Sequence, residues 1–157
     1  MVTEITNILN DFLKTQGYAE DEIYAEYREN EDSYYDESSS IPLIVLGGLA
    51  NKKADEVFMN FCKNDLGLKT EVSVITLSFL HELGHHNTID FLDEEENADS
   101  EFTKLMLAIL GEDTEKDYMS YFTCPIEIEA TIDAVEFCNH CPEAAMKLDA
   151  AIQKALI

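Results

Sequence analysis

The sequence is poor in positive charge. Its 157 residues include 10 Lys and Arg against 33 Asp and Glu, which gives a formal net charge of -23 at pH 7. Such a surface repels nucleic acids and anionic membranes, so DNA, RNA and membrane surfaces are poor partners. It favours cations and basic partners instead. We interpret the charge as an ordinary solvated acidic surface, with a surface that mimics a nucleic acid as the alternative.

The sequence also lacks long apolar runs, internal repeats and linkers. No segment reaches the length that crossing a bilayer requires, and the first residues show no basic region followed by an apolar stretch. We therefore expect a cytoplasmic protein with no membrane partner. In that compartment, four cysteines indicate free thiols or metal ligands rather than disulfides. Without a linker, residues 1–157 are expected to form one domain.

Helical periodicity is what the sequence does contain. Apolar residues at helical spacing predict helices over residues 3–16, 51–66, 70–86, 93–110, 126–138 and 143–156. In the fourth of these, the expected apolar stripe is formed by Phe102, Leu105, Met106 and Ile109. Residues 112–122 are expected to form a link or a short helix.

Strand signals are confined to the N-terminal third. The apolar run from Ile41 to Leu46, ended by two glycines, predicts a buried strand. Residues 22–27 are compatible with a short helix or a strand, whereas 33–40 has the composition of a loop. Together these patterns predict an α+β, predominantly helical domain with a small β-sheet near residues 33–47.

The recognisable chemistry is H-E-x-x-H, formed by His81-Glu82-Leu83-Gly84-His85 within a predicted helix. Imidazoles four residues apart lie on one helical face and can hold one Zn²⁺. Glu82, beside the first His, can take a proton from a water molecule that the metal activates. Gly84 leaves space for a metal site or for a close-packed backbone. The alternative is two histidines on a partly exposed face that make ordinary hydrogen bonds.

A catalytic zinc site needs a third protein ligand and keeps one position open. Glu127 and Glu129 are candidates, because they are acids among apolar residues at a helix start behind Pro125. Glu95, in an E-x-x-A-D pattern, is the other candidate. It follows His85 by only ten residues, which leaves little chain to reverse direction.

The two motifs together carry a family resemblance. His81-Glu-Leu-Gly-His85, followed by Glu127-Ile-Glu-Ala-Thr-Ile-Asp-Ala134, resembles the ImmA/IrrE-type metallopeptidases and related small phage-encoded proteins. That group has H-E-x-G-H and then a helix with E-x-E-A-N-x-F-A. Thr131 stands where the group often has Asn or Asp, and Asp133 where it often has Phe.

The resemblance implies a zincin-like metallopeptidase domain over the chain. It implies His81, His85 and Glu127 as zinc ligands, with Ala130 as a small residue packed against the site. It also implies a specific protein substrate, such as a repressor or a toxin-system partner. The acidic composition suggests that this substrate is basic.

Several further residues are open to a functional interpretation. His86, Tyr118 and Tyr121 are candidate donors to the oxyanion that peptide hydrolysis develops. Cys124, Cys138 and Cys141 with His140 or Cys62 have the ligand types of a structural zinc site, but one C-x-x-C pair is a weak signal and unbonded thiols are favoured. The competing function is a non-enzymatic acidic zinc-binding protein, such as an inhibitor or a nucleic-acid mimic.

Overall fold

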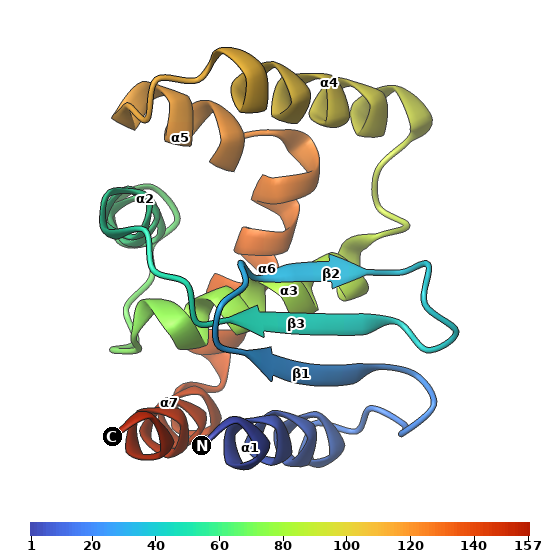
Figure 1. Cartoon of the computed structure of the whole chain (residues 1–157), viewed down its shortest axis with the longest axis vertical. Coiled ribbons are helices and arrows are strands. Elements are labelled where there is room, and N and C mark those ends of the chain that lie inside the picture. The colour runs from blue at the N-terminus through green and yellow to red at the C-terminus, as the bar shows by residue number, and fades with distance from the viewer.

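Seven α-helices surround one small sheet in the computed structural model, which describes residues 1–157 (Figure 1). The helices are α1 (Val2–Thr15), α2 (Lys52–Asn60), α3 (Val74–Thr88), α4 (Glu94–Leu110), α5 (Glu115–Phe122), α6 (Pro125–His140) and α7 (Pro142–Leu156). A π-helical turn, η1 (Phe61–Asp65), continues α2, and the strands are β1 (Tyr24–Arg28), β2 (Tyr34–Asp36) and β3 (Leu43–Gly47). The predicted α+β, predominantly helical class is confirmed. No helix combines the length and apolar character needed to cross a membrane.

The sheet has the strand order β1-β3-β2, with β1 parallel and β2 antiparallel to β3. The central strand is the predicted one, and its residues Ile44, Val45 and Leu46 are fully buried. The ambiguous segment 22–27 is a strand. The prediction of a loop over 33–40 is wrong for β2, which is held by pairing with β3 rather than by its own Asp- and Ser-rich composition.

The outer edge of β1 is covered by α1. The Asn10 side-chain amide donates to the Ala25 carbonyl at 2.7 Å, and its oxygen accepts the Ala25 N–H at 3.0 Å. Thr6 Oγ1 accepts the Tyr27 N–H at 3.0 Å. Side chains of a helix thus take the place of a neighbouring strand, which protects an otherwise open edge.

The hydrophobic core lies between the sheet, α3, α6 and the terminal helices. Its cluster of 24 buried residues draws on α1, α3, α6 and α7 but on neither α4 nor α5. Those two helices lie at the opposite end from α1 and α7 (Figure 1). The predicted apolar stripe of α4 is therefore not a core stripe: Phe102, Leu105 and Ile109 are exposed. Propensity places the helix correctly, but tertiary contacts decide which of its faces is buried.

Helix α3 begins at Val74, four residues later than predicted. The Thr70 hydroxyl donates to the Cys138 carbonyl of α6 at 2.7 Å, which keeps this segment outside the helix. Asp149 of α7 then accepts the Ser73 N–H at 3.0 Å and the Thr76 hydroxyl at 2.6 Å. A carboxylate from another helix thus caps the start of α3, where the helix dipole favours negative charge.

Candidate metal centre

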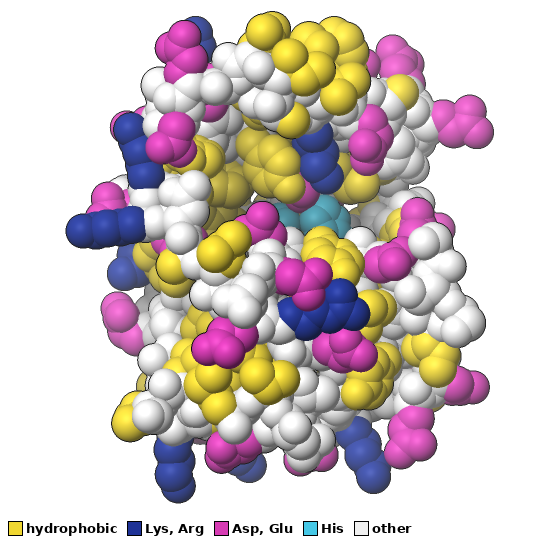
Figure 2. All heavy atoms as spheres, in the orientation of Figure 1, with side chains coloured by type: hydrophobic (Ala, Val, Ile, Leu, Met, Phe, Trp, Pro, Cys, Tyr) yellow, Lys and Arg dark blue, Asp and Glu magenta, His cyan; other side chains and the backbone are white.

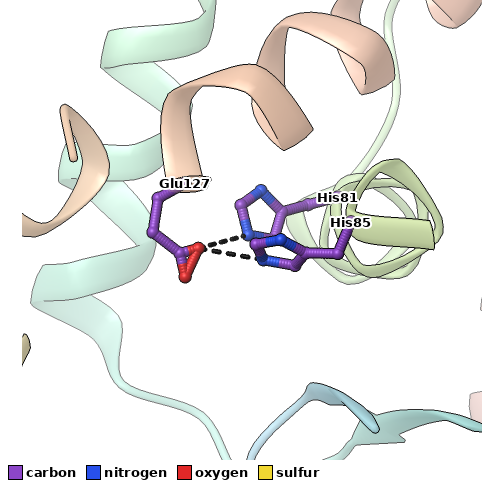
Figure 3. Close-up of side chains that lie close together, drawn as sticks. All are labelled: His81, His85 and Glu127. Carbon is purple, nitrogen blue, oxygen red and sulfur yellow. Dashed lines mark ion pairs between the residues drawn. The ribbon is translucent and has the colours of Figure 1, made fainter. Parts of the chain in front are cut away.

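Two helices bring three potential metal ligands together. His81 and His85 project from one face of α3 towards Glu127 at the start of α6 (Figure 3). Glu127 Oε2 lies 3.3 Å from His81 Nε2 and 2.9 Å from His85 Nε2. The three ligand atoms lie within 4.8 Å of one another, and Glu127 is only 2% exposed. This buried group can bind a metal ion, and it contains the three ligands that the sequence predicted.

Gly84 sets the distance between α3 and α6. A Cβ built at Gly84 would lie 2.3 Å from the Ala130 carbonyl oxygen and 3.0 Å from the Ala130 Cα. Both contacts are with backbone, so only a residue without a side chain permits this approach. Ala130, which is fully buried, is the small residue on the other side. Gly84 therefore permits close packing of the α3 and α6 backbones, which was one of the two roles predicted for it.

Thr131 fixes the orientation and tautomer of His81. The Thr131 hydroxyl donates to the Glu127 carbonyl at 2.9 Å, as a threonine can four residues along a helix. Its oxygen lies 2.8 Å from His81 Nδ1 and must therefore accept the hydrogen of that nitrogen. Nε2 of His81 is then the ring nitrogen that faces the other two ligands. Threonine thus makes the supporting contact at a position where Asn or Asp was expected.

Glu127 is held by one oxygen and leaves the other free. The Tyr121 hydroxyl donates to Oε1 at 2.9 Å, and Lys104 Nζ lies 3.4 Å from the same atom. Burial alone would raise the pKa of Glu127, but contact with His81 and His85 outweighs burial and holds that pKa below its ordinary range. The carboxyl is therefore ionised.

The free oxygen, Glu127 Oε2, is buried and has no hydrogen-bond partner. It lies 3.3 Å from His81 Nε2 and 2.9 Å from His85 Nε2, the two ring nitrogens that face the site. A buried acceptor without a donor costs about 1–3 kcal/mol, more when it is charged. A cation between the carboxylate and the two rings removes this cost. The residues present therefore fit a divalent metal.

Glu82 lies beside the three ligands without joining them. Its Oε1 is 4.0 Å from His81 Nε2, and the residue is 8% exposed. Burial and the negative charge of Glu127 raise the pKa of Glu82 to about 7, against the opposing effects of His85 and Lys104. A carboxyl with this pKa exchanges a proton readily near neutral pH, as a general base must.

The centre opens into two adjoining cavities of about 680 Å³ and 390 Å³. Three residues line both cavities close to the ligands: Glu82, Lys104 and Tyr121. The larger cavity has apolar walls that include Phe58, Ile75 and Phe122. Figure 2 shows histidine at the base of a hollow on this face of the molecule. A molecule larger than water can therefore reach the centre.

The other predicted ligands lie outside the group. Glu95 is exposed on α4, and Glu129 is partly exposed on the side of α6 away from the three ligands. No cysteine belongs to a group that can hold a metal, and all four cysteines are free thiols. Asp133 accepts a hydrogen bond from Asn87 at 3.1 Å rather than contacting a ligand.

The candidate oxyanion donors have other partners. His86 bonds to the Tyr35 hydroxyl at 2.9 Å through Nδ1 and lies 3.3 Å from Glu22 through Nε2. Tyr118 accepts a hydrogen bond from Asn51 at 3.1 Å and lines the larger cavity. Tyr121 donates to Glu127, and burial followed by that neighbouring charge raises its pKa. Tyr121 is therefore a protonated donor that orients a ligand.

Lys104 is the site residue that sequence reasoning missed. It comes from α4, in which the sequence analysis singled out only an apolar stripe and Glu95. One signal was available: Lys104 is the only Lys or Arg between Lys69 and Lys116. A lone cation in such an acidic stretch is a candidate partner for a buried carboxylate.

The chain was compared with protein families, curated proteins and solved structures. No family model, curated protein or solved structure matches it.

Proposed function

We propose that the protein is a zinc-dependent peptidase in which His81, His85 and Glu127 hold the ion. Two imidazoles and one carboxylate are a donor set that suits zinc. Structural zinc sites use four protein ligands, whereas catalytic sites use three and keep one position open. Three ligands beside two cavities therefore support a catalytic site over a structural one.

Glu82 carries this proposal, because a structural site needs no base beside its ligands. When bound, zinc supplies a Lewis acid that polarises the peptide carbonyl and acidifies water. Glu82 takes the proton from the attacking water and passes it to the leaving amine. Its position, 4.0 Å from His81 Nε2 and at the junction of both cavities, suits this transfer.

The walls of the cavities favour a basic protein segment as substrate. Apart from the site itself, their charged residues are all acidic: Asp32, Glu37, Asp55, Glu101, Asp113 and Asp117. A basic segment is attracted to such a surface, and apolar side chains fit the walls near Phe58 and Ile75. The resemblance of the two motifs to ImmA/IrrE-type metallopeptidases supports a specific regulatory protein over broad digestion.

Paired glutamine substitutions test the proposal. Glu82→Gln should keep one zinc per chain and abolish cleavage of a basic peptide library. Glu127→Gln should lose the zinc, whereas the matched control Glu129→Gln, on the same helix, should keep both zinc and activity. Metal content is measured by elemental analysis and cleavage by mass spectrometry. Unchanged cleavage by the Glu82→Gln variant would exclude the assigned base.

The net charge of -23 favours a second candidate, a non-enzymatic zinc-binding protein that acts as an inhibitor or nucleic-acid mimic. The same experiment separates the two. A wild-type protein that holds one zinc but cleaves no member of the library supports the second candidate. A wild-type protein purified with no metal, and unable to bind added zinc, contradicts both.

A further inference from the structure

The outer face of α4 is apolar and exposed. Phe102, Leu105 and Ile109, which we call the α4 stripe, are 63%, 55% and 64% exposed. Their spacing of three and four residues places them in one row along the helix, spanning about 10 Å. Leu110, the next residue, is also exposed (70%) but lies to one side of this row. Figure 2 shows the corresponding apolar patch at the top of the molecule, over α4.

This exposure follows from what the inner face of α4 does. Ser100 is fully buried and accepts the Ile126 N–H at the start of α6 at 3.2 Å. Lys104, one turn later, lies against Glu127. Turning the stripe inwards would break both contacts and leave a buried carboxylate without its cation. An ordinary surface helix buries its apolar face, whereas the single buried residue of α4 is Ser100.

The charges around the stripe select its partner. The exposed charged side chains of α4 are all acidic: Glu94, Glu95, Asp99 and Glu101. Glu112 and Asp113, directly after the helix, are also exposed acids. A second copy of this chain would bring the same acids against one another, and anionic lipid would be repelled. A partner with an apolar row flanked by Lys and Arg is complementary in both respects.

We propose that the α4 stripe is a docking surface for an amphipathic helix of another protein, with basic residues beside its apolar row. Helix pairing by apolar anchors at this spacing is a common recognition mode. The partner's basic flanks meet the acids at both ends of α4. Docking uses the outer face only, so it requires neither bound metal nor access to the cavities.

A defined peptide tests the proposal. The probe is a synthetic helix with Leu at i, i+3, i+4 and i+7 and Lys elsewhere, compared with a scrambled peptide of identical composition. Wild-type protein should bind the helix at least tenfold more tightly than the scrambled peptide by isothermal titration calorimetry. The variant Phe102→Ser/Leu105→Ser/Ile109→Ser should lose that tenfold preference.

The control variant changes exposed apolar residues elsewhere. Val2→Ser/Met146→Ser, at positions 41% and 50% exposed, should keep the preference. Single Leu105→Ser should weaken binding at least threefold, which keeps the test decisive if the triple variant unfolds. Equal binding of the scrambled peptide, or an unaffected triple variant, overturns the proposal. So does a dimer in sedimentation that the triple variant abolishes, because the occupant would then be a second copy.

Discussion

Substituting Gly84 with alanine should weaken metal binding more than it weakens the fold. The added Cβ would lie 2.3 Å from the Ala130 carbonyl oxygen, whereas ordinary contact begins at 3.4 Å. Because the obstructing atoms are backbone, α6 must retreat by about 1 Å. Glu127, three residues before Ala130, moves with it and away from the two histidines. Metal sites tolerate displacements of only about 0.5 Å.

The two expected magnitudes differ. Overpacking costs about 1–3 kcal/mol, while alanine recovers about 1 kcal/mol of helix propensity over glycine. The free energy of unfolding of the metal-free protein should therefore fall by about 0–2 kcal/mol. Zinc affinity should fall by about 10- to 100-fold, the range seen when the support of a ligand is disturbed.

Urea unfolding in the presence of a chelator measures the free energy of unfolding of the metal-free Gly84→Ala variant. Competition with a chromophoric zinc chelator measures the zinc affinity of the same variant. The control is Gly84→Ala/Ala130→Gly, which should not recover affinity because the obstructing oxygen belongs to the backbone. A Gly84→Ala protein that is about 1 kcal/mol more stable and binds zinc as before would refute the close approach of the two helices.

Three further substitutions test the supports of the centre. Thr131→Val removes the acceptor of His81 Nδ1 and should lower zinc affinity about 10- to 100-fold, whereas Thr131→Ser should keep the wild-type affinity. Equal zinc affinities for the wild type and both Thr131 variants would contradict this contact. Lys104→Met removes a cation beside Glu127 and should tighten zinc binding by about 1 kcal/mol, a modest gain because the lysine is partly exposed. Weaker zinc binding by the Lys104→Met variant would show that Lys104 supports the metal site rather than competing with the ion. Asp149→Ala removes the cap of α3 and should lower the free energy of unfolding by about 1–2 kcal/mol in urea denaturation. An unchanged urea midpoint would show that solvent caps the helix equally well.

The choice between Glu127 and Glu129 could have been made from helical spacing. Residues 130, 131, 134 and 138 are buried in α6, and Glu127 stands three and four residues before the first two of them. Glu129, two residues on from Glu127, falls on another side of the helix. The spacing of buried residues in α6 therefore favours Glu127 as the third metal ligand, although the sequence analysis kept both Glu127 and Glu129 as candidates.

Other features depend on partners distant in sequence. The start of α3 is set by Asp149, and strand β2 exists because β3 offers it an edge. The inward face of α4 is chosen by contacts of Ser100 and Lys104 with α6. Local propensity predicted helices α3 and α4, but the sequence of a helix does not show which of its faces neighbouring elements will cover.

The cover that α1 provides for β1 has a consequence for how a peptide can approach. With one margin of the sheet occupied by Asn10 and Thr6, only β2 retains backbone groups free to accept another strand. Tyr34 and Tyr35 of β2 also line the smaller cavity together with His85. An extended chain that joins this sheet thus has a single place to do so. That place runs alongside the histidines and Glu127.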